Sequence, residues 1–118
     1  MSTIELYGGT ARAFADAVAG IRDDQWELSG LGVWSVRSLV GHTFRAVQTV
    51  IDYLALDEPD TITIATAELY YAHVTPDASA SAAVAHRGIE SGLALGDDPV
   101  QAIAAANKRV LIRLGEQR

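Results

Sequence analysis

Residues 32–42 read GVWSVRSLVGH and bring together the end of a loop, a helix cap and a histidine. Ser35 is placed to act as a helix N-cap, because its hydroxyl can accept a hydrogen bond from a free backbone N–H in the first turn. Trp34 comes just before the cap, where a large apolar side chain can pack onto the first turn, near Leu39, as a hydrophobic staple. The stretch therefore predicts where the main helix of the chain begins.

A helix from Val36 to about Leu56 is predicted next, because apolar residues recur at every third or fourth position, as in a buried stripe. At about 100° per residue, His42 falls to one side of this stripe, in line with Tyr53. His42 is therefore expected on a helix flank, facing either solvent or a groove between helices. The stripe itself consists of Val36, Leu39, Val40, Thr43, Phe44, Val47, Val50, Ile51 and Leu54.

Length and composition favour one domain over residues 1–118, since a chain of this size with 49% hydrophobic residues can bury a single core. The net charge of −6 argues against nucleic acid as a partner, because clustered Lys and Arg supply most of the affinity for phosphates. The absence of cysteine excludes disulfides, cysteine metal ligands and a protein thiol nucleophile. Without a signal-peptide pattern or a long apolar run, we expect a cytoplasmic protein that does not bind a membrane.

Caps and apolar periodicity predict the remaining helices. Ser2 and Glu5 have the spacing of a capping box, and Asp98-Pro99 has the form of a cap followed by a first helical turn. Trp26, in the connecting loop 23–33, is expected to plug the end of the helix bundle, with a pocket wall as the alternative. Residues 61–64 alternate like a strand but are interpreted as an extended linker. The predicted helices cover about Thr3–Ala19, Thr66–His73, Pro76–Leu95 and Pro99–Leu114.

The inner faces of the last two helices contain small or polar residues. Asn107 interrupts an otherwise apolar seam, so we expect it to have a hydrogen-bond partner and to help set the helix register. The predicted inner face of helix 99–114 consists of Val100, Ile103, Asn107, Val110, Leu111 and Leu114. That of helix 76–95 consists of Ala78, Ala82, Ala85, Ile89 and Leu93.

The pattern Trp-Ser-Val-Arg-x-Leu-Val-x-His resembles the metal-binding N-terminal domain of the mycothiol-dependent maleylpyruvate isomerases, within the DinB-like superfamily. Asp23–Trp26, Gly30–Gly32 and Leu95–Pro99 fit the same resemblance, which runs from about Asp23 to Leu114. It implies an all-α, DinB-like four-helix bundle. It also implies a divalent metal such as zinc, held by three side chains with an open position for a water or a thiolate.

His42 matches the first metal ligand of that family. The family's other ligands come from a later helix, which would be expected after Arg118. The resemblance therefore leaves two forms of the bundle open, one with and one without the family's closing C-terminal helix. Ser38 stands where the family commonly has an aspartate. Three outcomes stay open: a site rebuilt in a homodimer or with a partner chain, a site formed locally by His42, His86 and Glu90, and a lost site.

Two hypotheses for function follow. The first is a metal-dependent isomerase or S-transferase that uses an external thiol such as mycothiol, with Trp34, Arg37 and Tyr53 as pocket residues. The second is a non-catalytic helical-bundle module that acts through homodimerisation or a partner chain. The sequence favours the second, because an alanine-lined bundle without its closing helix exposes apolar surface that a dimer would cover.

Overall fold

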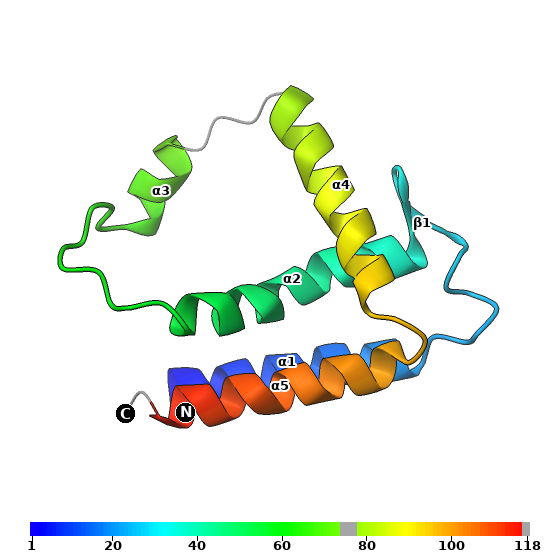
Figure 1. Cartoon of the computed structure of the whole chain (residues 1–118), viewed down its shortest axis with the longest axis horizontal. Coiled ribbons are helices and arrows are strands. Elements are labelled where there is room, and N and C mark those ends of the chain that lie inside the picture. Colours follow the sequence, from blue (N-terminus) through cyan, green and yellow to red (C-terminus); the bar gives the residue numbers. More distant parts are fainter. Residues whose placement is uncertain (74–77, 117–118) are drawn as a thin grey trace.

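The computed structural model describes residues 1–73 and 78–116, which are mainly helical and include one two-stranded antiparallel sheet (Figure 1). The all-α class is therefore confirmed. Within these ranges no helix is both long and apolar enough to cross a membrane. The elements in chain order are α1 (Thr3–Ala19), β1 (Ser29–Leu31), β2 (Trp34–Ser35), α2 (Val36–Leu54), α3 (Ala67–His73), α4 (Ala78–Ala94) and α5 (Pro99–Glu116).

The helix starts follow the predicted caps. The Ser2 hydroxyl accepts a hydrogen bond from the Glu5 backbone N–H, and the Glu5 carboxylate accepts one from the Ser2 N–H, both at 3.1 Å. The Ser35 hydroxyl accepts from the Ser38 N–H at 3.1 Å, which fixes the start of α2 at Val36. The predicted start of the next long helix, at residues 75–76, lies outside the described residues.

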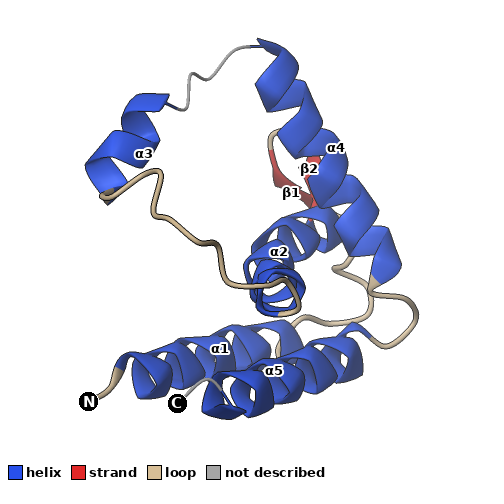
Figure 2. Ribbon diagram, turned by 60° about the vertical axis from the view of Figure 1, so that its left-hand side comes forward, coloured by secondary structure: helices blue, strands red, loops and turns tan. Residues whose placement is uncertain are grey.

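The core forms where α2 lies over the pair made by α1 and α5 (Figures 1 and 2). Both chain ends lie at the same end of this pair, and α1 and α5 run in opposite directions. The buried side chains form two clusters, one near the hairpin end of α2 and the other near its C-terminal half. The first contains Val18, Trp26, Val40, Leu95 and Ile103, and the second contains Val47, Ile51, Ala106 and Val110.

α4 packs against α2 through glycines rather than through interlocking side chains. A Cβ added to Gly41 would lie 2.1 Å from the backbone nitrogen of Gly92, and one added to Gly92 would lie 2.6 Å from the carbonyl oxygen of Arg37. A Cβ on Gly88 would lie 2.8 Å from the indole nitrogen of Trp34. The two backbones therefore meet at a distance that only residues without a side chain permit.

The predicted inner face of α4 is wrong, because α4 turns its glycines toward α2. Ile89 and Leu93 are exposed, by 37% and 68%, whereas Gly88, Gly92 and the following Leu95 are buried. The inward side is therefore the glycine side, which a count of large apolar residues does not detect. Of the remaining predicted residues, Ala82 is exposed, Ala85 is half-buried, and the side chain of Ala78 is not among those described.

The predicted inner face of α5 is correct at its centre and wrong at Val100, and Leu111 faces α1 without being buried. Ile103 and Val110 are fully buried, at 0% exposure. Val100 and Leu111 are exposed by 42% and 40%. Val100 belongs to the surface of α5, whereas Leu111 lies beside Gly8 of α1 at the partly open edge between the two helices.

The connecting loop 23–33 leads into a short hairpin, residues 29–35, that the sequence did not predict. β1 and β2 are joined through Gly32, whose φ of +58° suits a residue without a side chain. Trp26, at the start of this segment, is buried in the first core cluster. Its predicted role as a plug at the end of the helices is confirmed.

α3 stands apart from the other helices in both views (Figures 1 and 2). None of its residues is buried, and residues 55–66, which lead into it, are exposed as well. Residues 61–64 form no strand, as predicted. The radius of gyration is 16.0 Å, whereas a compact domain of this length would have about 13.5 Å. The chain is therefore open, with an uncovered segment between α2 and α4.

Candidate functional site

Trp34, which lies just before α2, connects the start of that helix to α4. Its indole N–H donates a hydrogen bond to the carbonyl oxygen of Ala85 at 2.9 Å. The Trp34 ring is stacked on that of His42, with the ring centroids 4.5 Å apart and the planes at 27°. The Trp34 ring therefore contacts α4 and His42. His42 lies on the α2 flank, as predicted, and covers the indole while remaining exposed.

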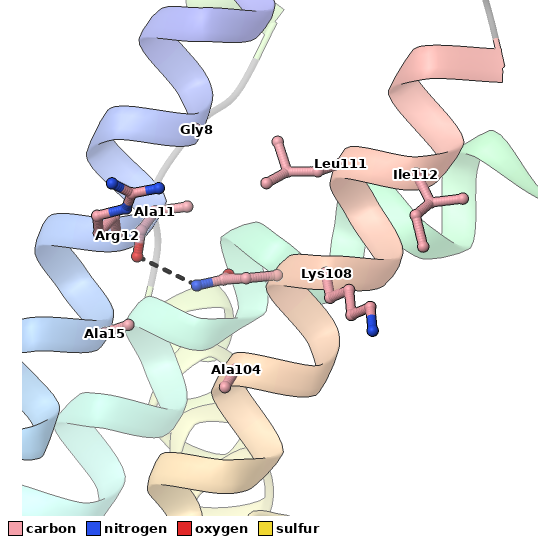
Figure 3. A pocket seen from close by; sticks show the side chains of 9 residues that line it. Gly8, Ala11, Arg12, Ala15, Ala104, Lys108, Leu111 and Ile112 are labelled. Carbon is pink, nitrogen blue, oxygen red and sulfur yellow. Dashed lines mark hydrogen bonds between the residues drawn. The ribbon is translucent and has the colours of Figure 1, made fainter.

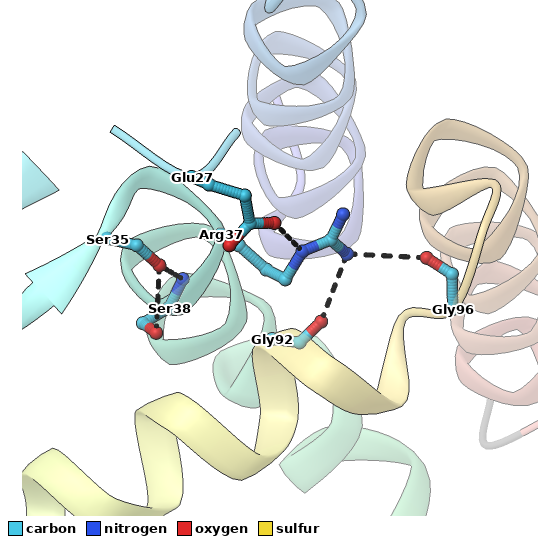
Figure 4. A network of polar contacts seen from close by, with 6 residues as sticks. All are labelled: Glu27, Ser35, Arg37, Ser38, Gly92 and Gly96. Atoms are coloured by element: carbon cyan, nitrogen blue, oxygen red, sulfur yellow. Dashed lines mark hydrogen bonds and ion pairs between the residues drawn. The ribbon is translucent and has the colours of Figure 1, made fainter. Parts of the chain in front are cut away.

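Arg37 holds three segments together (Figure 4). Its Nε–H donates to Glu27 at 2.8 Å, and Nη1 donates to the carbonyl oxygens of Gly92 at 3.5 Å and Gly96 at 3.3 Å. The guanidinium also lies 5.1 Å from the centre of the Trp26 ring. Carbonyl groups at a helix C-terminus lack helical partners and carry partial negative charge, which a cation stabilises. Predicted as a pocket residue, Arg37 instead ties the loop to the end of α4.

Ser38 shows how the cap of α2 works without the family's aspartate. Its side chain is buried, and its hydroxyl lies 3.1 Å from the Ser35 hydroxyl (Figure 4). The partner of Arg37 is Glu27, from the preceding loop. The cap of α2 therefore contains a pair of hydroxyl groups, and the carboxylate that pairs with Arg37 comes from the preceding loop.

The three candidate metal ligands do not form one site. His86 Nε2 and Glu90 Oε1 are 2.8 Å apart on an exposed face of α4. His42 is stacked on Trp34. Among the described residues, no group of three or more His, Cys, Asp or Glu side chains is placed to hold a metal ion. The described donors therefore do not fit a three-ligand metal site within one chain.

The proposed pocket residues also fail to meet. Trp34 and Arg37 lie at the start of α2, and Tyr53 lies near its end. At about 1.5 Å per residue the separation along the helix is roughly 28 Å. Tyr53 is exposed at that position. The three residues therefore belong to two different ends of the molecule.

The side chain of Tyr7 borders a small hollow of about 130 Å³ between α1 and α2. Its hydroxyl is buried and has no hydrogen-bond partner among the described residues. Burial raises the pKa of Tyr7 above its usual value, because the ionised form would lose its hydration. The phenol is therefore neutral at physiological pH.

A larger apolar groove runs between α1 and α5 and has a volume of about 490 Å³ (Figure 3). The Asn107 side-chain N–H₂ donates to the carbonyl oxygen of Ala11 at 3.1 Å, which confirms that Asn107 faces this seam. Its side-chain oxygen is buried and unpartnered within the described part of the chain. The groove is lined by Gly8, Ala11, Arg12, Ala15, Ala104, Asn107, Lys108, Leu111 and Ile112.

The sequence analysis did not find this groove. Its one available signal was the recurrence of Gly8, Ala11 and Ala15 on one face of the first helix, where small side chains leave room between helices. Arg12 and Lys108 line the same groove from opposite helices, and neither forms an ion pair with any described residue. The groove thus combines an apolar floor with two free positive charges.

These features define a mainly helical chain with an open arrangement, an apolar groove and no assembled metal site in its described part. Comparison of the chain with protein-family models, curated proteins and solved structures gives no match. A proposal for function therefore depends on the residues and geometry of this chain.

Proposed function

We propose that this chain is a helical-bundle module of the DinB-like type that works by associating with a second copy of itself. The observation that supports the proposal is its exposed area of 8558 Å² for a mass of 12.5 kDa. A compact monomer of that mass would expose only about 6,200 Å². The excess, roughly 2,400 Å² per chain, is of the size that each subunit of an obligate homodimer buries.

The chemistry of the exposed surface supports the same proposal. Large apolar side chains point outward from the hairpin, α2, the linker, α3 and α4, beyond the scattered exposure that is normal for a monomer. A homodimer with two-fold symmetry would cover such surfaces in pairs. The most exposed of them, apart from Met1, are Leu31, Val33, Tyr53, Leu56, Ile62, Tyr71 and Leu93.

The expected result is a dimer at micromolar concentration, with twice the chain mass of 12.5 kDa in sedimentation equilibrium. The variant Leu93→Glu, which places a charge on an exposed apolar position, should weaken the dimer if α4 contributes to the interface. The exposed loop variant Arg22→Glu is the control. A wild-type chain that sediments as a compact monomer would rule out the homodimer.

A second candidate function is metal- and thiol-dependent isomerase or S-transferase chemistry. It is favoured by the adjacent donors His86 Nε2 and Glu90 Oε1, which lie 2.8 Å apart and are open to solvent. A third ligand would have to come from a second copy, because the described part of one chain supplies none.

If this second candidate holds, protein purified without a histidine tag should contain about one zinc, nickel or manganese ion per chain or per dimer. Elemental mass spectrometry measures this content. His86→Ala should abolish the metal binding, whereas His73→Ala, on the separate helix α3, should not. Metal-free protein after incubation with excess ion would exclude the candidate.

A further inference from the structure

We propose that residues 55–73, here called the arm, dock into the α1/α5 groove of a second copy, so that two chains exchange arms. The arm consists of the linker 55–66 and helix α3. The inference rests on the proposed homodimer and deepens it, because it names the surfaces that meet. Exchange in both directions closes a two-fold dimer, with each chain giving one arm and accepting another.

The described part of the chain leaves its own arm uncovered. All of its residues are exposed, including the apolar side chains of Ile62, Leu69, Tyr70 and Tyr71. α3 is seven residues long and buries nothing. Isolated helices shorter than about 12–15 residues are marginal in water, and most helices in proteins are stabilised by packing. α3 therefore needs a surface to pack on.

The groove offers such a surface. Its lining includes three alanines and one glycine, and Leu111 points from α5 toward α1 (Figure 3). Its volume of about 490 Å³ lies in the range of sites that bind compact apolar ligands, about 300–1,000 Å³. The apolar side chains of a short helix fit a groove of this size and chemistry.

The charges of the arm and the groove are complementary. The arm carries Asp57, Glu58, Asp60 and Glu68, and no Lys or Arg occurs between Arg45 and Arg87. None of these four carboxylates forms an ion pair in the described part of the chain. The groove presents Arg12 and Lys108, which likewise have no ion-pair partner among the residues that the structure describes. Opposite charges of this kind orient two surfaces toward one another and favour the matching partner.

Chain geometry directs the arm to another copy rather than to its own groove. α3 and the start of α4 lie on the side of α2 opposite to the α1/α5 pair (Figures 1 and 2). Only four residues, 74–77, separate α3 from α4, so the two helix ends stay within about 20 Å of each other. The twelve-residue linker 55–66 can span roughly 40 Å, enough to reach an adjacent molecule.

Cysteine cross-linking tests the exchange, because the natural chain contains no cysteine. One chain carries Tyr70→Cys in the arm and another carries Leu111→Cys in the groove. The two are mixed, allowed to exchange subunits and oxidised mildly, and the mixed disulfide is identified by mass. A disulfide requires Cα atoms within about 4.4–6.8 Å, so it reports docking and not mere proximity.

The matched control replaces Leu111→Cys by Leu31→Cys, an exposed leucine on the hairpin away from the groove. The arm-to-groove disulfide should form at least about tenfold faster than this control. Equal rates in a chain that sediments as a dimer would overturn the arm placement and leave the homodimer standing. A monomeric wild-type chain would overturn the proposed function itself.

Charge reversal gives a second test that needs no cross-link. Lys108→Glu should raise the dimer Kd about tenfold at low salt, and Glu68→Lys in the same chain should restore it. Arg22→Glu is the control, since Arg22 pairs with Asp24 in the loop. A dimer Kd unchanged by Lys108→Glu would also overturn the placement of the arm.

Discussion

The variant Gly41→Ala is expected to lose about 3 kcal/mol of unfolding free energy, a large share of the 5–15 kcal/mol typical of a domain. The added methyl group would lie 2.1 Å from the backbone nitrogen of Gly92. Neither backbone can give way alone, since each belongs to a helix. Moving α4 outward would break the hydrogen bonds that Arg37 and Trp34 make with it.

Urea unfolding followed by far-UV circular dichroism, at one fixed protein concentration, measures this loss. Gly9→Ala is the matched control, because Gly9 is also inside a helix but has no atom within 4 Å of the added Cβ. That variant should be stabilised by up to about 1 kcal/mol. Wild-type stability in Gly41→Ala would contradict the close approach of α2 and α4.

The variant Trp26→Ala is expected to lose about 3–5 kcal/mol of unfolding free energy, as is usual when a large aromatic side chain is removed from a core. Trp26 is 7% exposed and packs in the cluster that contains Val18 and Ile103. The change also removes the ring beneath the Arg37 guanidinium. The cavity would therefore open where α1, the hairpin loop and α5 meet.

Thermal and urea unfolding of Trp26→Ala and Trp26→Phe measure the effect, with circular dichroism as the signal because tryptophan fluorescence changes with the substitution. Trp26→Phe should lose less than half as much unfolding free energy as Trp26→Ala. Trp34→Ala, which removes a half-buried ring, should cost less than Trp26→Ala. A small loss in Trp26→Ala would contradict the place of Trp26 in the first core cluster.

The helix boundaries could be predicted from the sequence because they depend on short-range chemistry. The Ser2–Glu5 capping box and the Ser35 cap are formed by residues three positions apart, and both are present. The pairing of His86 with Glu90 is equally local and is also present. Neighbours on one helix are brought together by the helix itself, whatever the rest of the chain does.

The inner face of α4 could not be predicted because the contact is made by glycines. Periodicity marks a face by its large apolar residues, and Ile89 and Leu93 point outward here. Gly92 faces inward only because Gly41, on another helix, lies opposite to it. Glycines that face one another across two helices do not add to the periodic pattern of large apolar residues by which an inner face is predicted.

The candidate site was predictable only in part, because several of its contacts join residues that are far apart in the chain. His42 was correctly placed on a helix flank, but its stacking on Trp34 depends on the way α4 crosses α2. Arg37 was expected in a pocket, whereas its partners come from the loop and from the end of α4. Contacts between residues far apart in the chain require the packing to be known first.

The long stretch without lysine or arginine affects how the arm can be studied by proteolysis. Trypsin cleaves after basic residues, so it leaves residues 46–87 as one peptide even when the arm is uncovered. Chymotrypsin cleaves after large aromatic residues and meets Tyr70 and Tyr71 on the exposed helix α3. Exposed, poorly packed segments are where proteases cut first. Chymotrypsin therefore distinguishes a free arm from a docked one, and resistance to trypsin at these positions carries no information about docking.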